Sequence, residues 1–242
     1  MELEDDAANQ VLYRIMGTED IPAVLEAVAR AFFEGEPVTA AARPPCTLGD
    51  WTRFTEMFLP HMAAEGHTVV AFDKATGKVL GALLNEDFVH PDPPAMEKFL
   101  DTSDGDWRPL MAMVEELEIQ LMESHKIPPK AEERPSGTFF HLWMLGVASS
   151  ARGRGVGSKL LRHSLLWAKQ RGFKMAFAET TGAISTGMVK KHCSPKLDAF
   201  VDYASWDKMP TSEELKQLPS LGHLGLSMLS IDLTDFAWKD AE

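Results

Sequence analysis

A short stretch of glycine and arginine, ARGRGVG at 151–157, carries the residues whose types and spacing most clearly suggest chemistry. Apolar residues at helical spacing follow it, so its glycines fall where a helix begins, although each glycine inside a helix costs about 1 kcal/mol relative to alanine. Uncovered backbone N–H groups at a helix start bind phosphate or pyrophosphate, and arginines add charge-assisted hydrogen bonds to the phosphate oxygens. The stretch therefore predicts an anion site, the alternative being a glycine-rich turn that only packs tightly.

Two common nucleotide motifs do not fit this stretch. A Walker A loop ends in Gly-Lys-Ser/Thr, whereas Gly157 is followed by Ser158 and only then by Lys159. A dinucleotide fingerprint reads G-x-G-x-x-G, whereas these glycines read G-x-G-x-G. The expected anion is therefore held by a different kind of loop.

The charge of the chain is unevenly distributed. The formal net charge is -12, which argues against broad binding to nucleic acid and is compatible with a cationic ligand. No Asp or Glu occurs from 134 to 178, so an anionic partner is expected there. The basic residues of that segment are Arg134, Arg152, Arg154, Lys159, Arg162, Lys169, Arg171 and Lys174.

The elements that must position the loop form a strand, glycine loop, helix and strand over 141–179. The apolar run at 138–149 predicts the first strand, and the alternation of apolar residues elsewhere predicts further strands and helices. The remaining expectations are strands at 11–16, 68–72, 78–88, 198–205 and 224–233, helices at 18–33, 50–64, 109–125 and 184–193, and an insertion at 91–137.

The motif R-x-x-G-x-G at 152–157, after a strand ending in LGV, resembles the signature of the GNAT superfamily of acetyl-CoA-dependent N-acetyltransferases. The resemblance implies a single α/β (α+β) domain over 1–242, with its core at about 11–235. It also implies a mixed, mostly antiparallel sheet, flanked by helices and splayed between its fourth and fifth strands.

The same resemblance assigns the residues that bind acetyl-CoA. The strand at Leu145, Gly146 and Val147 would pair with the pantetheine arm, and an amide near Val147 would polarise the acetyl carbonyl. A glycine inside a buried strand also fits a close approach by a ligand or another backbone. The pyrophosphate would lie on the loop formed by Arg152, Gly153, Arg154, Gly155, Val156, Gly157 and Ser158.

Two further stretches are similar to the arylalkylamine acetyltransferases within this superfamily, and two single positions correspond to serines of the insect enzymes. FFEGEPV at 32–38 is similar to an insect-type stretch, which implies that Glu36 is the general base. HLWMLGV at 141–147 matches the first histidine of a His-x-His pair at His141, while Trp143 replaces the second. Serines with catalytic or binding roles in the insect enzymes correspond to Thr181 and Ser185.

The chemistry of amine acetylation explains why a base is expected. An alkylamine with a pKa of about 10.4 is neutral to roughly one part in 10³ at pH 7, and only the neutral amine attacks a thioester. A carboxylate such as Glu36 accepts the proton directly or through one water and attracts the ammonium ion. The alternatives are a solvated loop glutamate at Glu36 and a buried, hydrogen-bonded core histidine at His141.

The sequence leaves the acceptor open. An arylalkylamine is the leading class, followed by a polyamine, an amino acid or a protein amine, and a non-catalytic acetyl-CoA-binding module is the alternative from another class. Trp51, Phe54 and Phe58 have helical spacing and either wall an aryl pocket or belong to the core. With two cysteines and no apolar span, we expect a cytoplasmic monomer that binds no metal, membrane or nucleic acid.

Overall fold

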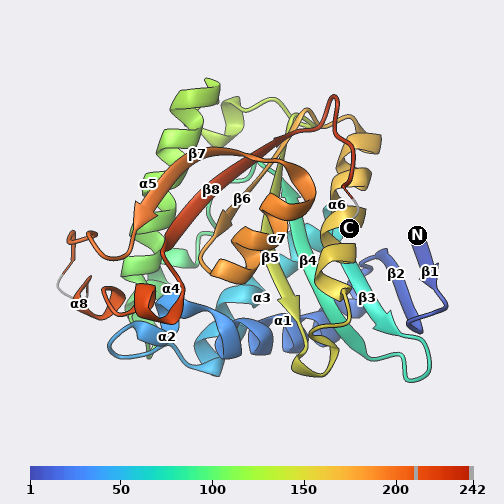
Figure 1. Ribbon diagram of the computed structural model, residues 1–242, viewed down its shortest axis with the longest axis horizontal. Coiled ribbons are helices and arrows are strands. Elements are labelled where there is room, and N and C mark those ends of the chain that lie inside the picture. The colour runs from blue at the N-terminus through green and yellow to red at the C-terminus, as the bar shows by residue number, and fades with distance from the viewer. Residues whose placement is uncertain (210–211, 240–242) are drawn as a thin grey trace.

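The computed structural model describes residues 1–209 and 212–239, and its centre is one mixed sheet (Figure 1). Eight strands of the described residues follow the order β1-β2-β3-β4-β5-β6-β8-β7, and all neighbours are antiparallel except β5 and β6. The strands are β1 (Glu2–Asp6), β2 (Val11–Ile15), β3 (Val69–Asp73), β4 (Val79–Asp87), β5 (Phe139–Val147), β6 (Met175–Thr180), β7 (Lys196–Asp202) and β8 (Gly225–Asp232).

The parallel pair of strands β5 and β6 opens into a gap. Only three residue pairs join them, and the last pairs His141 with Phe177. Counted from β2, these are the fourth and fifth strands, so the expected splayed sheet is confirmed. The gap leaves one backbone edge of β5 free of a strand partner beyond His141, and such an edge can pair with an extended ligand.

A bulge in β5 sets the direction of its side chains. Leu84 of β4 pairs with Met144 and Asn85 pairs with Leu142, so Trp143 is an extra residue in β5. The alternation of sides shifts at such a bulge. Met144 and Trp143 consequently pack into the same hydrophobic cluster, while Leu145 packs into the cluster on the other face.

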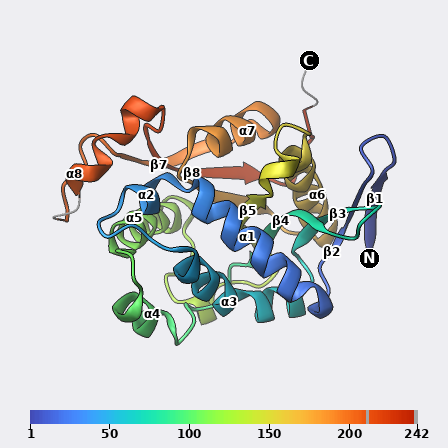
Figure 2. The ribbon, with the colours of Figure 1, turned by 90° about the horizontal axis from the view of Figure 1, so that it is seen from below.

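Helices cover both faces of the sheet, as seen from below in Figure 2. One face carries α1, α3, α4 and α5, and the opposite face carries α6 and α7. The helices of more than one turn are α1 (Ile21–Gly35), α2 (Pro37–Ala41), α3 (Leu48–Glu65), α4 (Met96–Thr102), α5 (Arg108–His125), α6 (Val156–Arg171) and α7 (Ala183–Cys193). Each face buries its own hydrophobic cluster.

Helix α3 begins at a capping box, which fixes the segment that supplies part of the site. Thr47 Oγ accepts from the Asp50 amide at 3.1 Å, and the Thr47 amide donates to the Asp50 carboxylate at 2.9 Å. The fully buried Asp50 carboxylate also accepts from the amides of Asp104 and Gly105, both at 3.0 Å. These bonds tie the 91–137 segment to α3, and α5 of that segment packs on β7 and β8.

The first strand, β1, was not expected from the sequence. It pairs antiparallel with β2, although the acidic stretch ELEDD has no apolar alternation. Lys159 of α6 donates to Glu4 and Asp6 of this strand, at 2.7 Å each. The strand is thus held by its backbone ladder and by ion pairs to α6.

No helix among the described residues is long and apolar enough to cross a membrane.

Candidate active site

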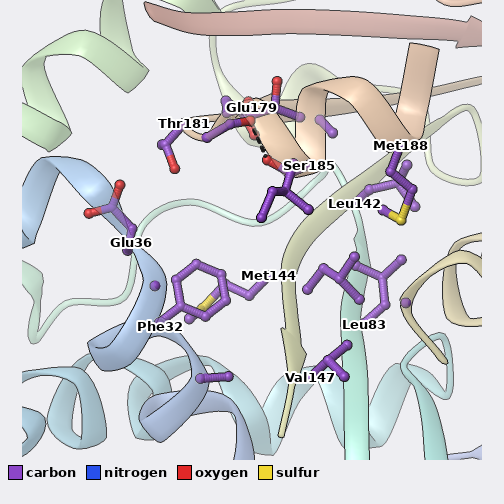
Figure 3. A pocket seen from close by; sticks show the side chains of 18 of the residues that line it. Phe32, Glu36, Leu83, Leu142, Met144, Val147, Glu179, Thr181, Ser185 and Met188 are labelled. Carbon is purple, nitrogen blue, oxygen red and sulfur yellow. Dashed lines mark hydrogen bonds between the residues drawn. The ribbon is translucent and has the colours of Figure 1, made fainter. Parts of the chain in front are cut away.

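A cavity of about 630 Å³ lies between the α1–α2 junction, strand β5, the start of α6 and the β6–α7 loop (Figure 3). It continues the gap between β5 and β6. Most of its wall is apolar, and charged or polar side chains enter it at a few places only. This combination is typical of a small-molecule site.

The loop between β5 and α6 has the shape that the glycines predict. Gly153 and Gly155 have φ of +78°, a conformation that favours glycine, and Gly155 is the N-cap of α6. Val156, Gly157 and Ser158 form the first turn of α6, where amides lack helical partners, and all three line the cavity. The start of α6 therefore presents the uncovered N–H groups and positive helix dipole that bind an anion.

The two arginines of the loop point to different places. Arg152 lines the cavity, and its guanidinium donates to the Val147 carbonyl at 3.3 Å and to Glu34 at 3.2 Å. Arg154 donates to the Asn9 carbonyl at 2.9 Å and is not among the residues that line the cavity. Only Arg152 of the pair thus faces the expected anion directly.

The basic segment around α6 is partly neutralised within the fold. Lys159 is paired with Glu4 and Asp6, and hydrogen bonds from Lys159 and Asn9 lower the pKa of Asp6 to about 2. Lys169 donates to the Phe236 carbonyl. These cations are therefore engaged by the protein, and the anion site within the cavity rests on Arg152 and the backbone amides.

The predicted donor-binding strand is brought to the cavity in part. Leu145 and Val147 line it, whereas Gly146 is not among the lining residues. A Cβ at Gly146 would lie 3.0 Å from the Cα of Val28 and 3.2 Å from the Cβ of Ala31. The close approach that requires glycine at this position is thus made by helix α1.

Glu36 stands at the junction of α1 and α2 and lines the cavity. It is 4% exposed, so it is not a solvated loop residue. Its carboxylate caps α2, accepting from the amides of Val38 at 3.0 Å and Thr39 at 2.6 Å. The carboxylate of Glu36 is thus fixed in place by α2, and the residue forms part of the cavity wall.

The β6–α7 loop supplies the hydroxyl groups of the site. Thr181 and Ser185 both line the cavity, and Ser185 donates to the Gly182 carbonyl at 3.0 Å. Tyr203, which is fully buried, donates to the Thr181 carbonyl at 2.9 Å and so fixes the loop. Figure 3 shows Ser185 and Thr181 on one side of the cavity and Glu36 across from Ser185.

His141 lies behind the cavity wall, because it is 2% exposed and is not among the lining residues. Its Nε2 contacts Glu179 at 2.8 Å and its Nδ1 contacts Glu86 at 3.2 Å. Burial alone lowers its pKa, but the charges and hydrogen bonds of both carboxylates outweigh burial and raise the pKa to about 10. His141 is therefore a buried imidazolium between two carboxylates.

Glu179 was missed in the sequence analysis although it lines the cavity. It lies on β6, two residues past the last residue paired with β5, so its side chain reaches the gap. The signal was a single charged residue in the otherwise apolar run MAFAET. Its importance depends on its contact with His141, which the sequence does not reveal.

The aromatic stripe on α3 belongs to the core and also to the wall of the cavity. Trp51, Phe54 and Phe58 are all buried, and the first two line the cavity. Phe32 of α1 packs on Trp51 with 4.9 Å between ring centroids, and Trp143 of β5 lies 6.2 Å from Phe54. The stripe is therefore part of the core, and two of its rings also form part of the cavity wall.

The two cysteines are buried and free. Burial raises the pKa of the Cys193 thiol to about 12, and burial together with nearby carboxylates raises that of Cys46. Neither thiol is a ready nucleophile. No group of three or more His, Cys, Asp or Glu side chains suited to a metal ion occurs in residues 1–209 and 212–239.

The splayed sheet, with an open helix start at its gap, defines a mixed α/β fold whose cavity lies at the separation of β5 and β6. The model of the Acetyltransferase (GNAT) family matches residues 25–191. The chain therefore belongs to the GNAT acetyltransferase family, whose fold implies binding of acetyl-CoA. The comparison with curated protein sequences gave no significant match.

Several solved structures share the fold at low sequence identity. The C-terminal condensation domain of Ebony, solved with beta-alanyl-dopamine, is 13% identical with a TM-score of 0.75, covering 92% of this chain and 98% of that chain. Arylalkylamine N-acetyltransferase 2 from Aedes aegypti is 18% identical, with a TM-score of 0.69 and coverages of 93% and 99%. Polyamine N-acetyltransferase from Drosophila melanogaster, which forms N-acetylagmatine, is 18% identical, with a TM-score of 0.68 and coverages of 92% and 99%.

Proposed function

We propose that the protein transfers the acetyl group of acetyl-CoA to the primary amine of a small molecule, with arylalkylamines as the leading acceptor class. The observation that carries this proposal is the single cavity in which the start of α6, the free edge of β5, Glu36 and an aromatic wall meet. Both substrates would occupy this cavity together, so that transfer is direct.

The donor side of the cavity suits a pyrophosphate and an extended arm. The amides of Val156, Gly157 and Ser158 and the guanidinium of Arg152 would hold the phosphate oxygens. Gly157 supports this assignment, because a Cβ there would meet side chains only at 3.6 Å or more and would extend into the site. The backbone at Leu145 and Val147 would pair with the arm, and acetyl-CoA supplies the activated thioester.

The acceptor side has a carboxylate and aromatic rings. An ammonium group is attracted to Glu36, which accepts its proton directly or through one water. The rings of Phe32, Trp51 and Phe54 offer an apolar surface for an aryl group. Ser185 lies within the same cavity and would hydrogen-bond to the reacting groups or to a water.

His141 would take part in proton transfer only through Glu179, because it does not line the cavity itself. The raised pKa of His141 means that it holds its proton near neutral pH. Its more direct role in this proposal is to fix the carboxylate of Glu179 at the wall.

The experiment that tests the proposal is the release of free CoA from acetyl-CoA by the purified protein. A panel containing phenethylamine, tyramine, tryptamine, putrescine, agmatine and an amino acid is offered one amine at a time. Amine-dependent release, with the acetylated amine identified by mass spectrometry, is the expected result. Binding of acetyl-CoA without release for any amine would contradict catalysis and favour a binding module instead.

A further inference from the structure

The closed end of the gap between β5 and β6 contains a carboxylate that the proposed reaction does not use. The two strands are last paired at His141 and Phe177, and Glu179 is the next residue of β6 on the same side of the sheet. Figure 3 shows it on the β6 side of the cavity beside Thr181 and Ser185, away from Glu36. The cavity therefore has two carboxylates, which enter from different elements.

One oxygen of Glu179 is fixed and the other is free. Its side chain is 5% exposed, and Oε2 accepts from His141 Nε2 at 2.8 Å. Oε1 is buried and has no hydrogen-bond partner in the described part of the chain. A buried carboxylate oxygen without a partner is unfavourable, so a donor from a ligand would complete the site.

The imidazolium beside this carboxylate is shared with a second carboxylate. Glu86 and Glu179 flank one imidazolium, His141, so two negative charges face one positive charge. Glu86 is held ionised, because hydrogen bonds from His141 and His61 outweigh burial and lower its pKa to about 2. Glu179 thus shares the imidazolium of His141 with Glu86, whereas His61 contacts Glu86.

The pKa of another carboxyl group, that of Glu118, is affected by the charge of Glu179. Burial, together with the charge of Glu179, raises the pKa of Glu118 on α5 to about 8. The nearby cation Arg134 directs its guanidinium to the carbonyls of Pro128 and Pro129. Burial is the larger cause of this raised pKa, and the charge of Glu179 adds to it.

We propose that Glu179 binds a second cationic group of the acceptor, which, among the small primary amines of the proposed function, favours a diamine or an aminoguanidine over an arylalkylamine. This inference rests on the proposed function, because the first nitrogen would lie at the thioester near Glu36. An ammonium or guanidinium at Oε1 both donates the missing hydrogen bond and balances the charge. A hydroxyl group on an aromatic ring of the acceptor would donate the hydrogen bond but would carry no positive charge. Glu179 is a specificity-determining residue in this arrangement.

Equilibrium binding separates this inference from catalysis. Isothermal titration in saturating CoA compares putrescine and agmatine with n-butylamine, a monoamine of matched carbon chain. We expect both dications to bind more tightly than n-butylamine, and Glu179→Gln to weaken the dications roughly 10- to 100-fold while changing n-butylamine little. This measurement needs no turnover, so an inactive protein that still prefers dications would refute the proposed function alone.

Two variants keep the result interpretable. Glu179→Asp retains the charge and should retain part of the preference for dications, and Glu115→Gln removes an exposed carboxylate of α5 and should change nothing. Equal weakening of mono- and dications by Glu179→Gln would overturn the inference, since Glu179 would then act at the reacting nitrogen. A preference for tyramine over phenethylamine that vanishes in Glu179→Gln, with no preference for dications, would overturn it in favour of a neutral donor.

Discussion

At the scale of single residues, Glu36 combines two duties that are usually separate. Its carboxylate caps α2 through the amides of Val38 and Thr39, and the same carboxylate faces the cavity. The cap explains why a charged side chain is tolerated at 4% exposure, because two amide donors satisfy its oxygens. As the proposed general base, Glu36 would be positioned before the amine arrives.

Replacing Glu36 with Gln should lower kcat/KM for the amine by about 10²- to 10⁴-fold, because shape is kept and basicity is lost. Binding of acetyl-CoA should be unchanged. The loss of one capping bond should also destabilise the fold by about 1 kcal/mol, which thermal unfolding measures. Thr47→Ala removes the cap of α3 and is the control for that effect alone. Equal activity of wild type and Glu36→Gln between pH 6 and 9 would contradict the assignment.

His141 should remain protonated across the neutral range. Its pKa is raised to about 10, so its imidazole NMR signals should not titrate between pH 6 and 8.5, and His141→Gln identifies them by their loss. Because the unfolded pKa is about 6.5, the stabilising contribution of His141 is complete below pH 6.5 and declines as the pH rises towards 10. Titration of these signals near pH 6.5 would contradict the buried ion pairs.

At the scale of elements, the proposed function assigns binding of the acetyl donor to the β5–α6 unit. The first turn of α6 is open to the cavity, and Gly157 lies there without a positive φ. Gly155 has φ of +78°, so a substitution at Gly155 would strain the backbone and confuse binding with folding. Gly157 is thus the better position at which to test the phosphate site.

We expect Gly157→Val to raise the dissociation constant of acetyl-CoA by at least about tenfold, because the new side chain would occupy the space next to the amides. Gly187→Val is the control, since a Cβ at Gly187 of α7 has no atom within 4 Å. Fluorescence or calorimetric titration measures both variants. Unchanged affinity in Gly157→Val would place the phosphates elsewhere.

The elements that could be predicted from sequence are those with local signals. The glycine motif and the apolar run before it gave β5, the loop and α6, and the 3.6-residue period gave α3 and α5. Strand β1 could not be predicted, because it depends on pairing with β2 and on ion pairs from Lys159. The bulge at Trp143 depends on the register of β4 and leaves no local signal.

The residues of the candidate site could be predicted only where the sequence around them forms a local motif. Glu36, Ser185 and the loop lie in motifs that are contiguous in sequence, and the structure brings them to one cavity. The electrostatic surroundings of Glu179 come from Glu86 and His141, which are distant along the chain. Such groups of charges arise only when the strands are aligned.

At the scale of the whole molecule, folding places acidic residues against part of the cationic segment. The net charge is -12, yet β1 places Glu4 and Asp6 against Lys159 and so removes part of the positive patch. Within the cavity, Arg152 and the start of α6 supply positive charge. An anionic donor and a cationic acceptor would thus be directed to opposite ends of one cavity.

The central claim is that this cavity binds acetyl-CoA, and calorimetric titration of the purified protein with acetyl-CoA tests it most directly. We expect one molecule to bind per chain, the melting temperature to rise with ligand concentration, and Gly157→Val to abolish or strongly weaken both effects. Absence of heat and of any thermal shift at saturating acetyl-CoA would contradict the account.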